Sequence, residues 1–248
     1  MSNLLISLVK RVPYVKSKLA GLRPDLGDIL SNFYPRDAHL TFLDVGANAG
    51  QTIDYIRLQF PNVIIHSFEP TPDVFSRLED KYGSLSNVFL YEIALADKDG
   101  KLNFYASNFS PTNSCLEPNQ AVYEKLGGDV KDMISNVVSY EVDAVRLDNW
   151  YSANIEGKEI DVIKIDTQGF EHNVIKGGLE TLRNHCKIVF FEAHYFDFYH
   201  GETPFYKTFE LLYENGFYLY CLMPCEKKDK FQWVESDVVF LNDRFFPR

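Results

Sequence analysis

Apolar runs alternate with amphipathic segments from residue 40 to the end of the chain. Buried strands are predicted at Leu40–Val45, Val63–Phe68 and Val88–Ile93, because each is a short apolar run bounded by turn residues. Helices are predicted between them, over Thr52–Gln59 and over Pro72–Tyr82, which has proline in its first turn. This succession is typical of a parallel, doubly wound α/β sheet with helices on both faces.

The pattern changes in the middle of the chain and then resumes. After a turn at Asp99-Gly100, a strand that returns antiparallel is predicted at Lys101–Ala106, and the polar stretch Ser107–Asn119 is predicted to be a loop. The remaining predicted elements are strands at Val137–Val142, Ile160–Ile165, Lys187–Phe191, Phe217–Leu222 and Asp237–Leu241, and helices at Glu171–Lys176 and Pro204–Glu214. We therefore expect one α/β domain at residues 41–248, preceded by an N-terminal helical extension at residues 1–40.

Composition and charge narrow the class of partner. The chain has 248 residues, a net charge of −10 and a pI near 5.1, so no overall positive field favours nucleic acid, and none is predicted as a partner. The four cysteines form no CxxC pair, which favours free thiols and a cytoplasmic location. No apolar run approaches the roughly 20 residues of a membrane span.

The first 23 residues are basic, unlike the rest of the chain. Their cationic residues are Lys10, Arg11, Lys16, Lys18 and Arg23. A helix packed on the domain or on a partner subunit is the favoured interpretation, which leaves a homo-oligomer open. Contact of residues 1–23 with a membrane surface is the alternative.

A glycine-bracketed turn follows the first predicted strand, in the sequence "FLDVGANAG". Its glycines allow the backbone to approach a ligand closely, Asn48 tolerates a left-handed conformation, and the next helix offers unpaired N–H groups. The residues predicted to contact a cofactor here are Asp44, Gly46, Ala47, Asn48, Gly50 and Thr52. The alternative is a turn with a purely structural role.

The next two strand ends complete a possible adenosine site. Glu69 ends the second strand in "SFEP", where its carboxylate is placed to accept hydrogen bonds from both ribose hydroxyls, with Pro70 beside it. Ala94, after the third strand, is predicted to flank the adenine ring. A solvated acid at a strand end is the alternative for Glu69.

Two classes of adenosine cofactor fit these positions. A dinucleotide needs a third glycine for its pyrophosphate, and Gln51 occupies that place. S-adenosylmethionine has no phosphate but carries an ammonium and a sulfonium group, which Asp44 and Asp166, predicted on neighbouring strands, complement in charge. The acidic positions therefore favour S-adenosylmethionine.

These motifs together resemble the FkbM family of S-adenosylmethionine-dependent methyltransferases. The resemblance rests on "FLDVGANAGQT", "SFEP", "ALADKDG", "VRLDNW" and "DVIKIDTQGFEHNVIKGG", and it spans about Thr41 to Leu222. It implies a Rossmann-like class I methyltransferase fold with a mostly parallel seven-stranded sheet. It also implies Asp44 and the glycine turn around the methionine part and Glu69 on the ribose. Gln168 departs from the family pattern, in which glutamate is frequent at this position.

The resemblance further implies methyl transfer to an oxygen, in a sugar, a glycan or a natural product. A hydroxyl acceptor must lose a proton, and His194 is the predicted general base because it follows a strand end beside the cofactor site. Asp166 is the second candidate. A divalent metal held by Asp166, Glu192 and His194 is an open alternative but is not expected.

The resulting hypothesis is an O-methyltransferase that uses S-adenosylmethionine and a small-molecule or glycan hydroxyl acceptor. Two alternatives remain at this point. One is an NAD-dependent oxidoreductase, which the absent third glycine disfavours, and the other is a non-catalytic domain of the same fold.

Overall fold

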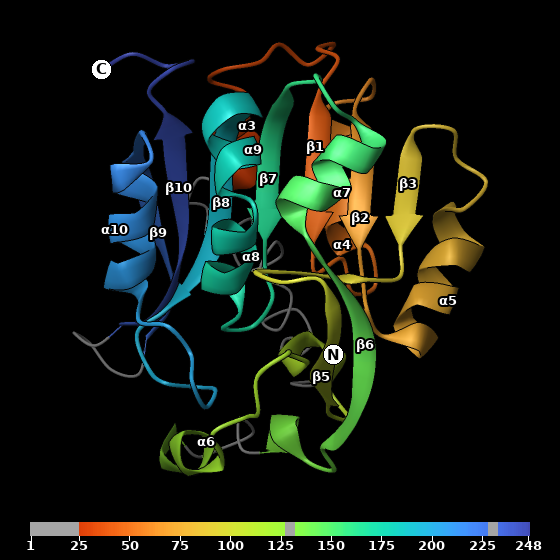
Figure 1. Ribbon diagram of the computed structural model, residues 1–248, viewed down its shortest axis with the longest axis vertical. Coiled ribbons are helices and arrows are strands. Elements are labelled where there is room, and N and C mark those ends of the chain that lie inside the picture. Colours follow the sequence, from red (N-terminus) through yellow and green to blue (C-terminus); the bar gives the residue numbers. More distant parts are fainter. Residues whose placement is uncertain (1–24, 127–131, 228–232) are drawn as a thin grey trace, which may run out of the picture.

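The computed structural model describes residues 25–126, 132–227 and 233–248. The basic segment predicted at residues 1–23 lies outside the described residues. Figure 1 shows the strands of one large sheet side by side, with helices in front of it and behind it.

The large sheet has seven strands in the order β3-β2-β1-β7-β8-β10-β9. Their bounds are β1 Thr41–Val45, β2 Ile64–Phe68, β3 Val88–Tyr91, β7 Ile160–Ile165, β8 Cys186–His194, β9 Phe217–Lys227 and β10 Trp233–Asn242. Strands β3, β2, β1, β7 and β8 are parallel, and β10 runs antiparallel to both β8 and β9. The predicted mostly parallel, seven-stranded, Rossmann-like sheet is therefore confirmed.

Alternate residues of each strand face two separate core layers, which is why the strands are apolar throughout. On one face, Leu43 and Val45 of β1 pack with residues of three helices, α7 Leu147–Asn154, α8 Glu171–Gly177 and α9 Leu179–His185. On the other face, Phe42 packs with α4 Gln51–Gln59 and α5 Pro72–Tyr82. Helix α10 Phe205–Glu214 contributes Leu212 to the first layer.

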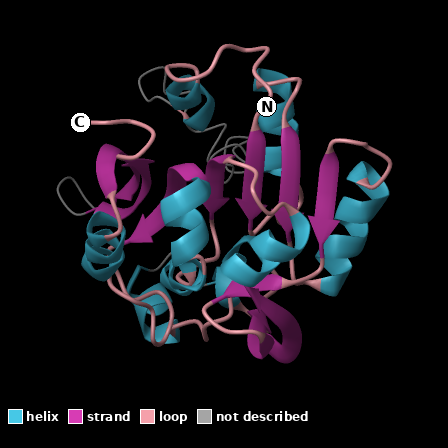
Figure 2. Cartoon of the chain, turned by 45° about the horizontal axis from the view of Figure 1, so that its top comes forward, coloured by secondary structure: helices cyan, strands magenta, loops and turns pink. Residues whose placement is uncertain are grey.

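A second sheet was not predicted from the sequence. It has three strands in the order β4-β6-β5, with bounds β4 Ala94–Ala96, β5 Gly100–Ala106 and β6 Val138–Arg146. Strand β5 is antiparallel, as predicted, but it pairs with β6 and does not join the large sheet. Figure 2 shows this small sheet lying next to the carboxyl ends of the parallel strands.

Several elements differ in length or number from the prediction. Helices α6 Gln120–Leu126, α7 and α9 were not predicted, because two of them are only seven residues long and carry too little periodicity. Strand β8 continues past Phe191 to His194, because its pairing with β10 extends to that residue. Glu192 and His194 therefore lie within a strand and not beyond the sheet.

Residues 25–40 pack on the α/β domain. Helix α3 Leu26–Leu30 begins with a capping box in which Asp25 accepts from the backbone N–H of Asp28. Its buried side chains, together with Leu40, belong to the same core layer as Phe42. The boundary predicted at residue 41 therefore separates chain segments that share one hydrophobic core.

In the described residues, every helix is too short or too polar to cross a membrane.

Candidate active site

The glycine turn between β1 and α4 has the backbone conformation that its sequence predicts. Gly46, Asn48 and Gly50 have φ angles of 83°, 45° and 79°, which place all three in the left-handed region. The backbone N–H groups of Gly46 and Ala47 both donate to the carbonyl oxygen of Phe68, at 3.0 Å. No side chain in the described residues caps the N-terminus of α4, so its first N–H groups face the turn.

The two glycines are required by the protein's own packing. A Cβ atom on Gly46 would lie 1.9 Å from the carbonyl oxygen of Asp166, and one on Gly50 would lie 2.4 Å from the Tyr82 ring. The sequence-based explanation, close approach of the backbone to a ligand, is therefore incomplete. The turn is held against β7 and α5 before any ligand is considered.

Glu69 connects this turn to the end of β2. Its two carboxylate oxygens accept the backbone N–H groups of Asn48 and Thr71, each at 2.9 Å. Burial raises the pKa of Glu69 above its usual value, although these two hydrogen bonds oppose the shift. Each oxygen keeps lone-pair capacity for another donor. The predicted ribose contact remains a prediction that this geometry suits.

Asp44 and Asp166 lie on neighbouring strands, as predicted, but a lysine lies between them. The Lys164 ammonium is 3.5 Å from Asp44 Oδ1 and 3.3 Å from Asp166 Oδ2. Burial raises the pKa of Asp44 to about 6, against the opposing charge of Lys164. Burial also acts to raise the pKa of Asp166, but Lys164 and the Gln168 amide outweigh it and hold that pKa below its usual value. The two acids therefore share one counter-ion.

Three further residues predicted to contact the cofactor are Thr52, Pro70 and Ala94. Thr52 and Pro70 are partly buried, the first in the opening turn of α4 and the second directly after Glu69. Ala94 lies in β4 and pairs with Ala144, and it is buried in the core layer on the α7–α9 side. The third strand of the large sheet ends at Tyr91, two residues earlier than predicted, and the contact of Ala94 with adenine stays a prediction.

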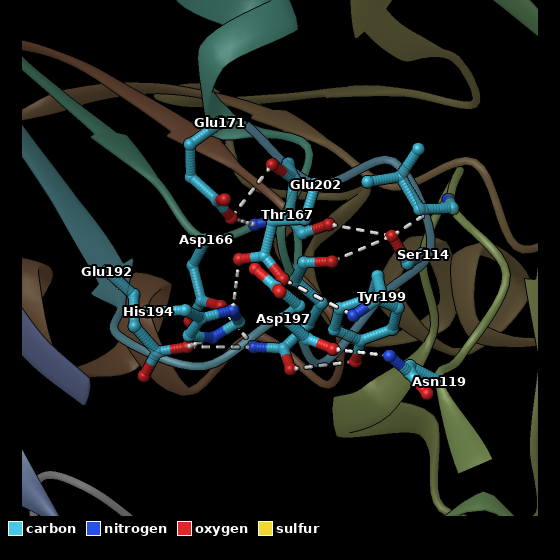
Figure 3. A network of polar contacts seen from close by, with 12 residues as sticks. Ser114, Asn119, Asp166, Thr167, Glu171, Glu192, His194, Asp197, Tyr199 and Glu202 are labelled. Atoms are coloured by element: carbon cyan, nitrogen blue, oxygen red, sulfur yellow. Dashed lines mark hydrogen bonds and ion pairs between the residues drawn. The ribbon is translucent and has the colours of Figure 1, made fainter. Parts of the chain in front are cut away.

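The turn after β7 joins two carboxylates through one amide. The Gln168 Nε2 group donates to Asp166 Oδ1 at 2.9 Å and to Glu192 Oε2 at 3.0 Å (Figure 3). Gln168 also has a positive φ of 56°, in the left-handed region. A glutamate at this position could not donate to either carboxylate, so the departure from the family pattern suits these neighbours.

His194 is held by carboxylates on both ring nitrogens. Its Nδ1 atom lies 2.7 Å from Glu202 Oε1 and its Nε2 atom lies 3.3 Å from Glu192 Oε2 (Figure 3). Burial acts to lower the pKa of His194, but the bonds to Glu192 and Glu202 outweigh it and raise that pKa well above the usual value. Both ring nitrogens are therefore engaged by carboxylates, and the role of His194 as general base stays a prediction.

The alternative that the sequence left open, a divalent metal held by Asp166, Glu192 and His194, is only partly matched by the structure. Glu192 and His194 are in contact, but Asp166 reaches Glu192 only through the Gln168 amide, and its other oxygen faces Lys164. In the described residues these three side chains therefore do not converge on one point.

The polar loop after β5 lies over both turns. Ser110, in the short 3-10 helix Ser110–Thr112, donates to Asn48 Oδ1 at 3.0 Å. Ser114 donates to the carbonyl oxygen of Gln168 at 2.8 Å, and Asn113 accepts the backbone N–H of Ser107. The loop is therefore hydrogen-bonded to the β1–α4 glycine turn through Asn48 and to the turn after β7 through Gln168.

Four residues of this network were not predicted as site residues from the sequence. They are Lys164, Gln168, Tyr199 and Glu202. Lys164 had a detectable signal, since it is the lone cation in the apolar strand "IDVIKI". Glu202 and Tyr199 follow β8 in an irregular segment, where spacing along the chain gives no register, so only the folded structure brings them to His194.

Buried oxygens without partners test whether a cationic cofactor fits here. Within the described residues, Asp44 Oδ2 and Thr71 Oγ1 have no hydrogen-bond partner, and Asp44 Oδ1 has only the Lys164 ammonium at 3.5 Å. Buried polar atoms are ordinarily satisfied, and a carboxylate at a strand end suits a cationic amino-acid group. Together with the two free lone-pair directions of Glu69, these atoms fit the methionine and ribose parts of S-adenosylmethionine.

Comparison with known proteins points in one direction. The family model described as "Methyltransferase FkbM domain" matches residues 44–219. The chain is 29% identical over 212 residues to the 2-O-methyltransferase NoeI of Sinorhizobium fredii, covering 82% of this chain and 79% of that protein. It is 31% identical over 155 residues to the methyltransferase sdnD of Sordaria araneosa, covering 54% of this chain and 59% of that protein.

The fold also matches a solved structure. The crystal structure of a methyltransferase FkbM from Methylobacillus flagellatus superimposes with a TM-score of 0.54 at 13% identity, over 92% of this chain. The matched part is 50% of that protein, so the chain spans half the length of this relative. At this identity the match supports the fold alone.

Proposed function

Because the chain belongs to the FkbM methyltransferase family, we propose that it transfers the methyl group of S-adenosylmethionine to a hydroxyl of a sugar, a glycan or a small natural product. One observation carries the cofactor assignment. Glu69 is bound to the backbone of Asn48, which fixes a buried carboxylate beside the glycine turn at the carboxyl edge of the sheet. The carboxyl edge is where open α/β sheets bind their ligands.

The chain's contribution to the cofactor side is position and charge. S-adenosylmethionine, when bound, supplies an activated methyl group on a sulfonium centre. Glu69 would hold the ribose, and Asp44, with the turn residues Gly46 to Gly50, would hold the methionine part. Since methyl transfer is a displacement in line with the leaving sulfur, alignment by these residues supplies much of the rate.

Asp166 is our candidate for contact with the acceptor. Its side chain is 35% exposed, while Asp44 is fully buried. Lys164 and Gln168 hold its two oxygens in place and keep it ionised, so it can accept a hydrogen bond from the acceptor hydroxyl. His194 then acts as a positioning residue, because it fixes Glu192 and Glu202 beside this group.

Transfer to oxygen rests on the relative NoeI, whose description is that of a 2-O-methyltransferase. We also propose a cytoplasmic location, which the free thiols of Cys115, Cys186 and Cys221 favour. The two alternative functions predict different ligands. An NAD-dependent oxidoreductase would bind NAD, and a non-catalytic domain would bind cofactor without methylating any acceptor.

Calorimetric titration with S-adenosylhomocysteine tests the proposal. We expect micromolar binding to the native chain and at least tenfold weaker binding to Glu69→Gln, which keeps the size of the side chain but loses its charge. Glu92→Gln is the matched control, since Glu92 is exposed just after β3. Binding of NAD instead, or equal binding to both variants, would contradict the assignment of this site.

A further inference from the structure

We propose that Glu192, His194 and Glu235 form a binding site for a first-row divalent cation, such as Mn²⁺. One ligand atom from each of these side chains lies within 4.8 Å of the other two. Ligands bound at roughly 2.0–2.2 Å from an ion lie about 3 to 4.4 Å apart, so small side-chain rotations close the site. The set differs from the predicted one, since Glu235 of β10 takes the place of Asp166.

The strand register places the three side chains on one face of the sheet. Glu192 and His194 are two residues apart on β8, so both point to the same side. Glu235 pairs directly with His194 across the antiparallel β8–β10 ladder. Two rigid strands thus supply the ligands, and rigid supports are typical of metal sites with defined geometry.

His194 already has the orientation of a metal ligand. Its Nδ1 atom is 2.7 Å from Glu202 Oε1, and its Nε2 atom faces Glu192 Oε2 at 3.3 Å. Metal-binding histidines ordinarily donate one ring N–H to a carboxylate while the other nitrogen binds the ion. In this site Glu202 would hold the Nδ1 proton, and the cation would replace the proton on Nε2.

Charge in this region favours a bound cation. Asp166, Glu192 and Glu202 are linked through His194 and Gln168, and Glu235 adjoins them. Lys164 is the nearby counter-ion, but its ammonium is shared between Asp166 and Asp44. When the ion binds, the Nε2 proton of His194 would pass to solvent, and the two positive charges of the ion would balance Glu192 and Glu235.

The ligand set indicates the kind of ion. Two carboxylates and one imidazole suit Mn²⁺ or Zn²⁺ better than Ca²⁺ or Mg²⁺, which prefer oxygen ligands throughout. Because the Gln168 amide joins Glu192 to Asp166, the ion would adjoin the proposed acceptor side. There it would polarise the acceptor hydroxyl, a role that rests on the proposed methyltransferase function.

The test is to add Mn²⁺ to the full chain after a chelator has removed any bound metal. Calorimetry measures the affinity and stoichiometry, and electron paramagnetic resonance identifies the ligands. We expect one Mn²⁺ per chain, with nitrogen hyperfine coupling from His194. Glu235→Gln and Glu192→Gln should each weaken binding at least tenfold while leaving S-adenosylhomocysteine affinity unchanged. The matched control is Glu214→Gln, at the exposed end of α10, which should bind as the native chain does.

Two results would overturn the inference. One is no binding to the native chain at 1 mM Mn²⁺ and Zn²⁺ (about the weakest range in which a protein site is functional). The other is native affinity in both Glu235→Gln and Glu192→Gln, each shown to be folded by its thermal unfolding curve. S-adenosylhomocysteine binding is measured on the same samples, so a failed metal site and a failed methyltransferase assignment give different outcomes.

Discussion

Glu171 shows how strongly one buried side chain can depend on its surroundings. It opens α8, where its Oε1 atom accepts both the backbone N–H and the hydroxyl of Thr167. Burial raises the pKa of Glu171 to about 7, although the charge of His194 opposes the shift. From the sequence this residue is an ordinary helix-opening acid. Only the packing around it decides that its proton is held near neutral pH.

Replacing Glu171 should change how stability depends on pH. Between the usual pKa of 4.5 and the folded value of about 7, the folded chain holds a proton that the unfolded chain releases. Stability from this group is therefore complete below pH 4.5 and is lost as pH rises through 7. Glu171→Gln should remove up to roughly 3 kcal/mol of this pH dependence. Urea unfolding at pH 5 and pH 8 measures it.

The control is Glu214→Gln, which lies in solvent. It should keep the pH dependence of the native chain. If Glu171→Gln had the same pH dependence of unfolding free energy as the native chain, the pKa of Glu171 would not be raised in the folded state.

The β1–α4 turn illustrates a feature that belongs to an element and not to one residue. The sequence indicates its left-handed residues, because glycine and asparagine are the residues that adopt such angles most readily. A second reason for glycine at position 46 is steric. The carbonyl oxygen of Asp166, directly after β7, fills the space where a side chain would lie. The turn therefore contacts both Glu69, the predicted ribose ligand, and Asp166.

Two glycine substitutions separate the cost of a positive φ from the cost of the steric clash. Gly46→Ala meets both a positive φ and the Asp166 carbonyl oxygen at 1.9 Å, whereas Gly157→Ala meets a positive φ with nothing within 4 Å among the described residues. Gly157→Ala should cost about 1–2 kcal/mol of unfolding free energy. Gly46→Ala should cost more and should also abolish S-adenosylhomocysteine binding. Chemical denaturation and calorimetry measure the two effects, and equal costs would show that the clash is relieved by a small shift.

The molecule as a whole is one sheet between two apolar layers, and α3 belongs to one of them. Leu30 is fully buried in the layer that also holds Phe42, Ile53 and Ile65. Helix α3 therefore belongs to the hydrophobic core of the domain. The sequence had predicted residues 1–40 as a separate helical extension and the domain as beginning at residue 41. The small sheet and the loop over the two turns add a further structure at the carboxyl edge (Figure 2).

Truncating Leu30 should therefore destabilise the whole domain. Leu30→Ala should lower the free energy of unfolding by about 2–5 kcal/mol, the usual range for a fully buried leucine. Leu58→Ala is the matched control, since Leu58 is 61% exposed and should change stability by less than about 0.5 kcal/mol. Urea unfolding of both variants measures the difference. An unfolding free energy for Leu30→Ala equal to that of the native chain would show that the packing of α3 adds nothing to the stability of the domain.

Much of the fold and the conformation of the glycine turn could be predicted from the sequence. The β-α-β periodicity predicts the parallel strands, because apolar spacing is a local property that the helix and strand repeats read directly. The glycine turn and Glu69 followed in the same way, since each stands at the end of a recognisable strand. The family resemblance rested on these same local motifs and is confirmed by the family match.

The contacts around Asp166 and His194 were decided by the tertiary structure. Lys164 neutralises Asp44 and Asp166, and Glu202 and Glu192 hold both nitrogens of His194. The sequence supplies these residue types but not their partners, because ion pairs between strands and loops depend on register and on irregular backbone. The pKa depends on those partners and on burial, so the histidine predicted from its free pKa as a base lies, in the folded chain, between two carboxylates that raise its pKa.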